Sequence, residues 1–89
     1  MTILLLPHAG SDLMKVDLEV SSWFKRFTSG KPVVELELPD GTSAKGAAAS
    51  AGIPANEVGF ISINGCRADG DSMLKDGDRL KVYPVIIGG

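Results

Sequence analysis

The chain has 89 residues, of which 44% are hydrophobic and 22% charged, and its formal net charge is −2. These values are typical of one small globular domain and argue against a disordered chain. The nine Lys and Arg residues are scattered, so charge gives no support for nucleic-acid binding. One cysteine, Cys66, and one histidine, His8, cannot build an internal disulfide or a structural zinc site. We therefore expect a reducing, cytoplasmic setting.

The N-terminal part differs from the rest of the chain. Residues 1–13 are predicted to form an N-terminal extension or an extra edge strand, because Pro7 and Gly10 interrupt any regular pattern. The apolar run at residues 3–6 is too short to cross a membrane, so we expect neither an anchor nor export.

The domain itself is predicted to occupy residues 14–85. Apolar and polar side chains alternate over residues 14–20, which indicates a half-buried strand. A second alternating run at residues 34–38 predicts its hairpin partner. The segment between them, residues 22–30, is expected to form a helical turn or a wide connection.

The main helix is predicted after the turn Pro39-Asp40-Gly41. Thr42 or Ser43 can cap its first turn, and Gly52 suits its end. Because its inner face carries only methyl groups, the helix must lie close against a sheet. The alanines that share this face at helical spacing are Ala44, Ala47, Ala48 and Ala51.

Two further strands are expected beyond Pro54, which should end any helix. Residues 58–63 are apolar on both faces and predict a central strand, followed by the tight-turn pair Asn64-Gly65. Residues 67–77 are predicted to be irregular, with Met73 and Leu74 buried.

The last strand, residues 79–85, should place Leu80 and Val82 inward and Arg79, Lys81 and Tyr83 outward. Pairing should loosen at Pro84, which has no N–H to donate. These elements predict an α+β fold, with a mixed four- to five-stranded sheet and one main helix packed on one face.

Residues 86–89 are predicted to form a flexible tail that ends in Gly88-Gly89. A terminal glycine pair is a chemical handle, because no Cβ blocks access to the carboxylate and the backbone can thread into a narrow pocket. The alternative is an ordinary frayed end.

Three segments, taken in order, resemble the MoaD/ThiS family of sulfur carriers, which share the ubiquitin-like β-grasp fold. They are Ile61-Ser62-Ile63-Asn64-Gly65, Leu74-Lys75-Asp76-Gly77-Asp78-Arg79-Leu80, and the final strand with its Gly-Gly tail at residues 82–89. The resemblance covers residues 14–89. The long segment at residues 21–31 resembles the insert of the MoaD branch, whereas the tail resembles ThiS proteins equally well.

The resemblance implies a mechanism. A ubiquitin-activating-type enzyme of the MoeB/ThiF kind uses ATP to adenylate the carboxylate of Gly89, and sulfur then replaces AMP to give a thiocarboxylate. The sulfur acceptor is molybdopterin synthase in the MoaD branch or thiazole synthase in the ThiS branch. The carrier itself binds no cofactor or metal and is not an independent enzyme. A ubiquitin-like modifier, conjugated through Gly89, and a passive interaction module are the competing hypotheses.

Five residues besides the glycines are candidate partner contacts. Val85, Ile86 and Ile87 lead into the tail and suit strand addition in a partner's channel. Phe60 and Tyr83, together with Val58 on the same predicted face, are candidates for an apolar patch on an open sheet face. A packed core is the alternative, for Phe60 above all.

The aromatic residues Trp23, Phe24 and Phe27 are expected to cover one end of the core. Cys66 is expected to be a bystander thiol, and Lys45, Lys75 and Lys81 are expected to be solvated charges.

Overall fold

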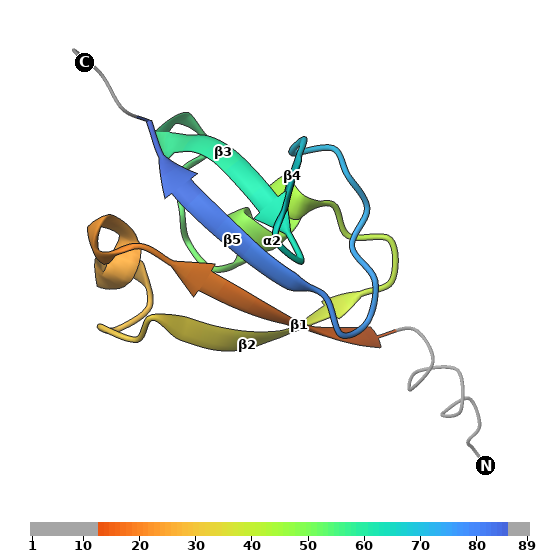
Figure 1. Ribbon diagram of the computed structural model, residues 1–89. Coiled ribbons are helices and arrows are strands. Elements are labelled where there is room, and N and C mark those ends of the chain that lie inside the picture. Colours follow the sequence, from red (N-terminus) through yellow and green to blue (C-terminus); the bar gives the residue numbers. More distant parts are fainter. Residues whose placement is uncertain (1–12, 86–89) are drawn as a thin grey trace.

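A computed structural model describes residues 13–85 of the chain (Figure 1). The predicted N-terminal extension, except for Leu13, and the predicted tail lie outside these residues. Leu13 is the first residue of the first strand. In chain order the elements are β1 (Leu13–Val20), the 3₁₀-helix η1 (Ser22–Phe27), β2 (Val33–Pro39), α2 (Ala44–Ser50), the 3₁₀-helix η2 (Ala55–Glu57), β3 (Val58–Ile63), β4 (Cys66–Ala68) and β5 (Arg79–Pro84).

The strands form one mixed sheet of five, in the order β2-β1-β5-β3-β4. β1 and β2 form the predicted antiparallel hairpin, and β5 lies parallel to β1 and antiparallel to β3. The α+β fold class and the mixed sheet with one main helix are therefore confirmed. β3 has neighbours on both sides, but the middle of the sheet is occupied by β5, because the last strand inserts between β1 and β3.

The helix α2 forms where the alanine pattern predicts it. The Ser43 side-chain oxygen accepts a hydrogen bond from the Gly46 N–H at 3.1 Å and so caps the first turn. At the other end Gly52 has a φ of +88°, and the Ile53 N–H donates to the Ala48 carbonyl at 3.1 Å. This pairing satisfies a carbonyl that would otherwise lack a partner. Both predicted caps are confirmed.

The core lies between α2 and one face of the sheet, and α2 crosses behind the strands in Figure 1. Ala44 and Ala47 are fully buried, so the small side chains bring the helix close to the strands, as expected. The sheet and its connections contribute the larger core residues, namely Met14, Val16, Leu18, Val20, Phe24, Leu38, Ile53, Ile61, Leu74, Leu80 and Val82.

Three local predictions between residues 53 and 78 need correction. Met73 is 63% exposed, whereas Leu74 is 4% exposed and belongs to the core. Successive residues of an extended segment point to opposite sides, so only one of the pair can be buried. Residues 66–68 form the short strand β4 rather than an irregular segment, and one 3₁₀ turn, η2, follows Pro54 directly.

Candidate functional site

The site predicted from the sequence centres on the end of β5 from which the tail leaves. β5 ends at Pro84, and Val85 is 44% exposed. The Val85 N–H still donates to the Glu57 carbonyl at 3.2 Å, which holds the chain to η2 just beyond the strand. Of the predicted tail contacts, Val85 is therefore accessible at the root of the tail. Ile86, Ile87, Gly88 and Gly89 lie outside the described residues.

A bulge in β3 lies opposite the root of the tail. The register between β3 and β5 shifts between Val58 and Phe60, with Gly59 as the extra residue. A Cβ at Gly59 would clash with the carbonyl oxygen of Pro84, so only glycine allows this close approach. The pairing is thus irregular at Pro84, where loosening was predicted.

The face of the sheet opposite α2 carries an aromatic pair. The rings of Phe60 on β3 and Tyr83 on β5 stack with centroids 4.2 Å apart and an interplanar angle of 9°. Tyr83 points outward as predicted, and Phe60 lies beside it on the open face rather than in the core. The packed-core alternative is therefore wrong for Phe60, which forms one patch with Tyr83. The open-face prediction is wrong for Val58, which packs against the core because the bulge at Gly59 breaks the alternation along β3.

Two cations flank this aromatic pair. The Arg67 guanidinium carbon is 4.6 Å from the Phe60 ring centroid, and the Lys81 ammonium is 5.1 Å from that of Tyr83. Cations at these distances are attracted to the negative faces of the rings. With the aromatic pair they line a shallow hollow of about 390 Å³ on the open face. The open-face patch is defined here as Phe60, Arg67, Lys81 and Tyr83.

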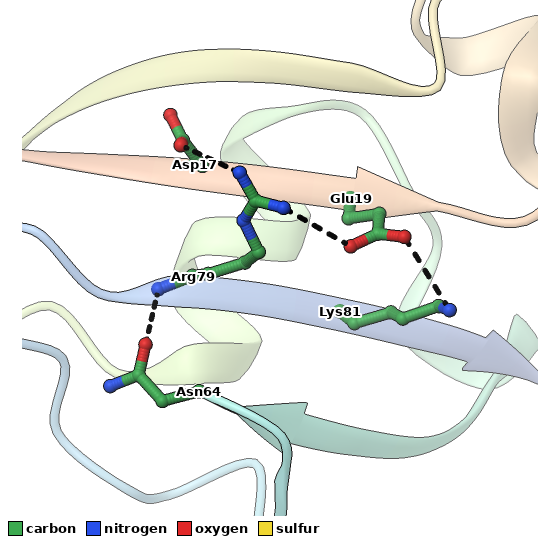
Figure 2. Close-up of polar contacts among 5 residues, drawn as sticks. All are labelled: Asp17, Glu19, Asn64, Arg79 and Lys81. Atoms are coloured by element: carbon green, nitrogen blue, oxygen red, sulfur yellow. Dashed lines mark hydrogen bonds and ion pairs between the residues drawn. The ribbon is translucent and has the colours of Figure 1, made fainter.

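An ion network extends the patch toward β1 (Figure 2). Arg79 lies between Asp17 and Glu19, with nitrogen–oxygen distances of 3.5 Å and 3.8 Å, and Lys81 is 3.5 Å from Glu19. The Glu19 carboxylate raises the pKa of Lys81 by charge attraction, and Tyr83 adds to the effect. The sequence predicted Lys81 to be a solvated charge. In the structure its side chain instead pairs with Glu19 on the neighbouring strand.

Sequence reasoning placed Arg79 on the outward side of the last strand, but it did not single out Arg67 or Glu19 as parts of this site. Arg67 follows a tight turn in a segment that was expected to be irregular. Glu19 and Arg79 are far apart in the sequence, and only the parallel pairing of β1 with β5 brings them together. The alternation along each strand was the one available signal, since it places these residues on the wet face.

The family-like motifs meet at the opposite end of β5. The Asn64 side-chain oxygen accepts from the Arg79 N–H and its amide donates to the Asp78 carboxylate, both at 2.9 Å. The other oxygen of Asp78 accepts from the Lys75 N–H at 2.8 Å. We refer to this group as the Asn64–Asp78 clasp. It joins the hairpin turn to the turn before β5, so these motif residues have a structural role.

The predicted aromatic cover of the core is only partly present. Phe24 is fully buried, and Phe27 packs against the core, but Trp23 is 58% exposed. The Arg26 guanidinium carbon lies 5.4 Å from the Trp23 ring centroid, and Arg26 pairs with Glu57 at 2.8 Å. Trp23 therefore belongs to the surface of η1, close to the element that holds the root of the tail.

Among residues 13–85, no group of three His, Cys, Asp or Glu residues is arranged to hold a metal ion. No helix in the same part of the chain is long and apolar enough to cross a membrane. Cys66 is a free, exposed thiol at the start of β4.

Together, the sheet order, the crossing helix and the strand that leads to the tail define a ubiquitin-like β-grasp protein. Residues 19–87 match the family model described as Mut7-C ubiquitin, and the chain belongs to this family. The predicted membership of the ubiquitin-like β-grasp proteins is thereby confirmed. No curated protein sequence matches the chain.

Solved structures support the same fold. The Haloferax volcanii protein HVO 2177 is similar with a TM-score of 0.72 and 20% identity, over 88% of this chain and 89% of that one. A putative molybdopterin converting factor, subunit 1, from Pyrococcus furiosus has a TM-score of 0.66 and 24% identity, over 82% and 99%. The H. volcanii small archaeal modifier protein 1 has a TM-score of 0.67 and 12% identity, again over 82% and 99%.

Proposed function

We propose that this protein is a ubiquitin-like sulfur carrier whose terminal glycine, Gly89, is adenylated and converted to a thiocarboxylate. The observation that carries the proposal is the path of β5. This strand lies in the middle of the sheet and ends at Pro84. The next residue, Val85, is exposed and precedes residues 86–89, which include Gly88 and Gly89. A reactive end held in this way can enter a partner's pocket while the body stays folded.

The proposed reaction takes place on the carboxylate and in the partner. A carboxylate oxygen of Gly89 attacks the α-phosphorus of ATP, and pyrophosphate leaves. A sulfur nucleophile then attacks the acyl carbon, the bond to AMP breaks, and a C-terminal thiocarboxylate remains. ATP belongs to the activating enzyme, so the chain supplies the reacting group and a docking surface, without being an enzyme itself.

The open-face patch is the proposed docking surface for the activating enzyme. It offers an aromatic pair flanked by cations, and aromatic and arginine side chains are frequent among the residues that dominate binding energy. The patch lies on β3 and β5, and β5 leads to the tail. A partner that covers Phe60 and Tyr83 is therefore well placed to receive Gly89. The cytoplasm remains the proposed setting, because the described thiol, Cys66, is free.

The most favoured acceptor is the large subunit of a molybdopterin synthase. The segment between β1 and β2 contains η1, which fits the insert that suggested the MoaD branch. Similarity to the putative molybdopterin converting factor subunit agrees with this preference. A ThiS-like role in thiamin thiazole synthesis is the alternative within the carrier class.

A protein modifier is the second candidate function, and the similarity to a small archaeal modifier protein supports it. The same adenylate serves both outcomes, because the acyl carbon of Gly89 can be attacked by sulfur or by a lysine amine. Isopeptide bonds between Gly89 and lysines of other proteins would identify a modifier.

The experiment that tests the proposal is intact mass spectrometry. The mass of the isolated protein first establishes whether Gly89 carries a free carboxylate. The protein is then incubated with a ubiquitin-activating-type enzyme, ATP and a sulfur source. We expect a mass gain equal to one oxygen replaced by sulfur, located at Gly89. No gain, with an enzyme that activates a control carrier of its own, would contradict the carrier function.

A further inference from the structure

An exposed tryptophan lies at the end of the sheet from which the tail leaves. β1 and β5 are parallel, with Val20 beside Val82, so η1, which follows β1, lies at the same end as the residues that follow β5. Figure 1 shows η1 and the arrowhead of β5 at this end. Trp23 on η1 is 58% exposed. Because no residue of the open-face patch belongs to η1, Trp23 is a surface feature that the proposed function does not use.

Other exposed apolar side chains lie at the same end. Val33, at the start of β2, pairs with the last part of β1 and is 37% exposed, and Val85 is 44% exposed at the root of the tail. Within residues 13–85, the other exposed large hydrophobic side chains are Leu13 and Met73. Both lie at the opposite end, because Leu13 begins β1 and Met73 bridges Ser43 shortly after β2 ends beside it. Three of these five side chains are therefore near the root of the tail.

The Trp23 side chain is held by Arg26. The Arg26 guanidinium carbon lies 5.4 Å from the Trp23 ring centroid and 4.6 Å from that of Phe27. The same guanidinium donates to the Trp23 carbonyl at 3.1 Å and to the Glu57 carboxylate at 2.8 Å. These contacts restrict the Trp23 side chain before a partner binds, so its immobilisation costs less entropy than that of a freely rotating side chain.

Glu57 connects this group to the root of the tail. Its carboxylate pairs with Arg26, and its carbonyl accepts from the Val85 N–H at 3.2 Å. Because Glu57 neutralises Arg26, the group presents an aromatic ring rather than an unpaired cation.

The reach of the tail limits where a partner can bind. Four residues follow Val85 in the sequence, and four residues extend over at most about 14 Å. An enzyme that encloses Gly89 must therefore come close to Val85. An interface of standard size covers roughly 800 Å² on each partner, which corresponds to a radius of about 16 Å. Trp23, joined to Val85 through Arg26 and Glu57, falls within reach of such an interface.

We propose that Trp23 is a docking residue for the ubiquitin-activating-type enzyme and enters an apolar cleft beside the channel that takes up the tail. The proposal rests on the carrier function and extends the docking surface from the open-face patch to η1. Tryptophan is enriched among the residues that dominate binding energy, because its large ring excludes much water when it is buried. Contacts at Trp23 and at Tyr83 hold the body at two places near Val85 and so direct the tail into the enzyme.

Trp23 is the only tryptophan of the chain, so its environment can be observed alone. The complete chain is labelled with 5-fluorotryptophan, and its single ¹⁹F signal is recorded while the unlabelled activating enzyme of the mass-spectrometry test is added. We expect the signal to shift or broaden, and to lose most of its sensitivity to exchange of H₂O for D₂O, because the indole leaves water. An unchanged signal from a chain that binds the enzyme, as measured by calorimetry, would overturn the proposal.

Two matched variants give a second measurement. Trp23→Ala should weaken binding to the enzyme by at least tenfold, and Trp23→Phe should weaken it less, because an aromatic ring remains. Met73→Ala is the control, since it shortens a side chain of similar exposure, 63%, at the opposite end of the sheet, and it should leave the affinity unchanged. Thermal unfolding verifies that all three variants are folded.

The outcomes separate this proposal from the carrier function. If the wild type gains a thiocarboxylate and Trp23→Ala binds the enzyme as tightly as the wild type, the docking role of Trp23 is overturned and the carrier function stands. Equal losses of affinity in Trp23→Ala and Met73→Ala would also overturn the docking role. If the wild type neither binds the enzyme nor gains a thiocarboxylate, both proposals are overturned.

Discussion

The two ends of β5 are held in different ways. At its start, the Asn64–Asp78 clasp fixes Arg79 with side-chain hydrogen bonds of 2.8–2.9 Å, and the Asp17 N–H donates to the Asp78 carbonyl at 3.0 Å. At its end, Pro84 has no N–H, and Val85 retains one backbone hydrogen bond of 3.2 Å to Glu57. One end is fixed by several polar partners, while the other is released beside a glycine bulge.

This difference would allow a small domain to present the proposed reactive tail without loosening its core. Leu80 and Val82, which lie between the two ends, are fully buried. Strain or pull on the tail would act first on the Val85 contact and the bulge, whereas the clasp would keep β5 in register with β1 and β3. The following predictions test this division, beginning with the largest expected effect.

Removal of Gly89, or addition of a residue after it, should abolish thiocarboxylate formation completely. The carboxylate would be lost from its position, or converted to an amide that cannot be adenylated. Thermal unfolding should be unchanged, because the buried core described here is formed by residues between Met14 and Val82. Intact mass spectrometry measures thiocarboxylate formation in both variants. A thiocarboxylate on the variant without Gly89 would contradict the proposal that the end of β5 leads to the reactive group while its start has a structural role.

Asn64→Ala should cost about 3 kcal/mol in the free energy of unfolding. It removes two side-chain hydrogen bonds, and alanine lacks the short polar side chain that lets asparagine tolerate a left-handed backbone conformation. Asn64 has a φ of +53°. Asn64→Gly is the matched control, because glycine accepts this φ, and it should lose about 1 kcal/mol less. Urea denaturation of both variants measures the difference. Equal losses would show that backbone strain plays no part in the clasp.

Gly59→Ala should destabilise the protein by about 2 kcal/mol, because the new methyl group would force the bulge away from the Pro84 carbonyl. Gly70→Ala provides a comparison at which the added Cβ meets only the Lys45 side chain, 3.3 Å away. Its effect should be smaller. If thermal or urea unfolding gave Gly59→Ala a wild-type stability, close packing at the root of the tail would not require glycine.

Tyr83→Ala should reduce stability by only about 1 kcal/mol, the contribution expected for a stacked aromatic pair. If the open-face patch docks the activating enzyme, the same change should weaken binding by at least tenfold, whereas Tyr83→Phe should retain most of the affinity. Calorimetric titration with the enzyme separates the two effects. Unaltered affinity of Tyr83→Ala would exclude the patch as the docking surface.

Lys81→Gln should have the smallest effect, because the ion pair with Glu19 is exposed and screened by salt. The folded-state pKa of Lys81 is raised, so the pair's contribution is complete below the ordinary value of 10.5 and is lost as pH rises through the folded-state pKa. Wild-type and variant stabilities should therefore converge at high pH and at high salt. A difference that persists under both conditions would assign Lys81 a packing role instead.

Local chemistry made much of the fold predictable. Alternation identified β1 and β2, the alanine spacing with Ser43 and Gly52 identified α2, and Asn64-Gly65 identified the turn before β4. Each of these signals lies within a few residues of the structure that it specifies, so no distant contact was needed to read it. The same local information failed at Met73, because an isolated apolar pair does not reveal which member faces the core.

The sequence by itself determined the α+β composition, the polar and apolar faces of the strands, and the Gly-Gly segment after the last strand. Only the tertiary structure decided that β5 fills the middle of the sheet, that Phe60 stacks on Tyr83 outside the core, and that Glu19 meets Arg79 and Lys81. These pairings join residues about 20 to 60 positions apart in the sequence. They depend on strand order and register, which arise only when the whole chain packs on α2.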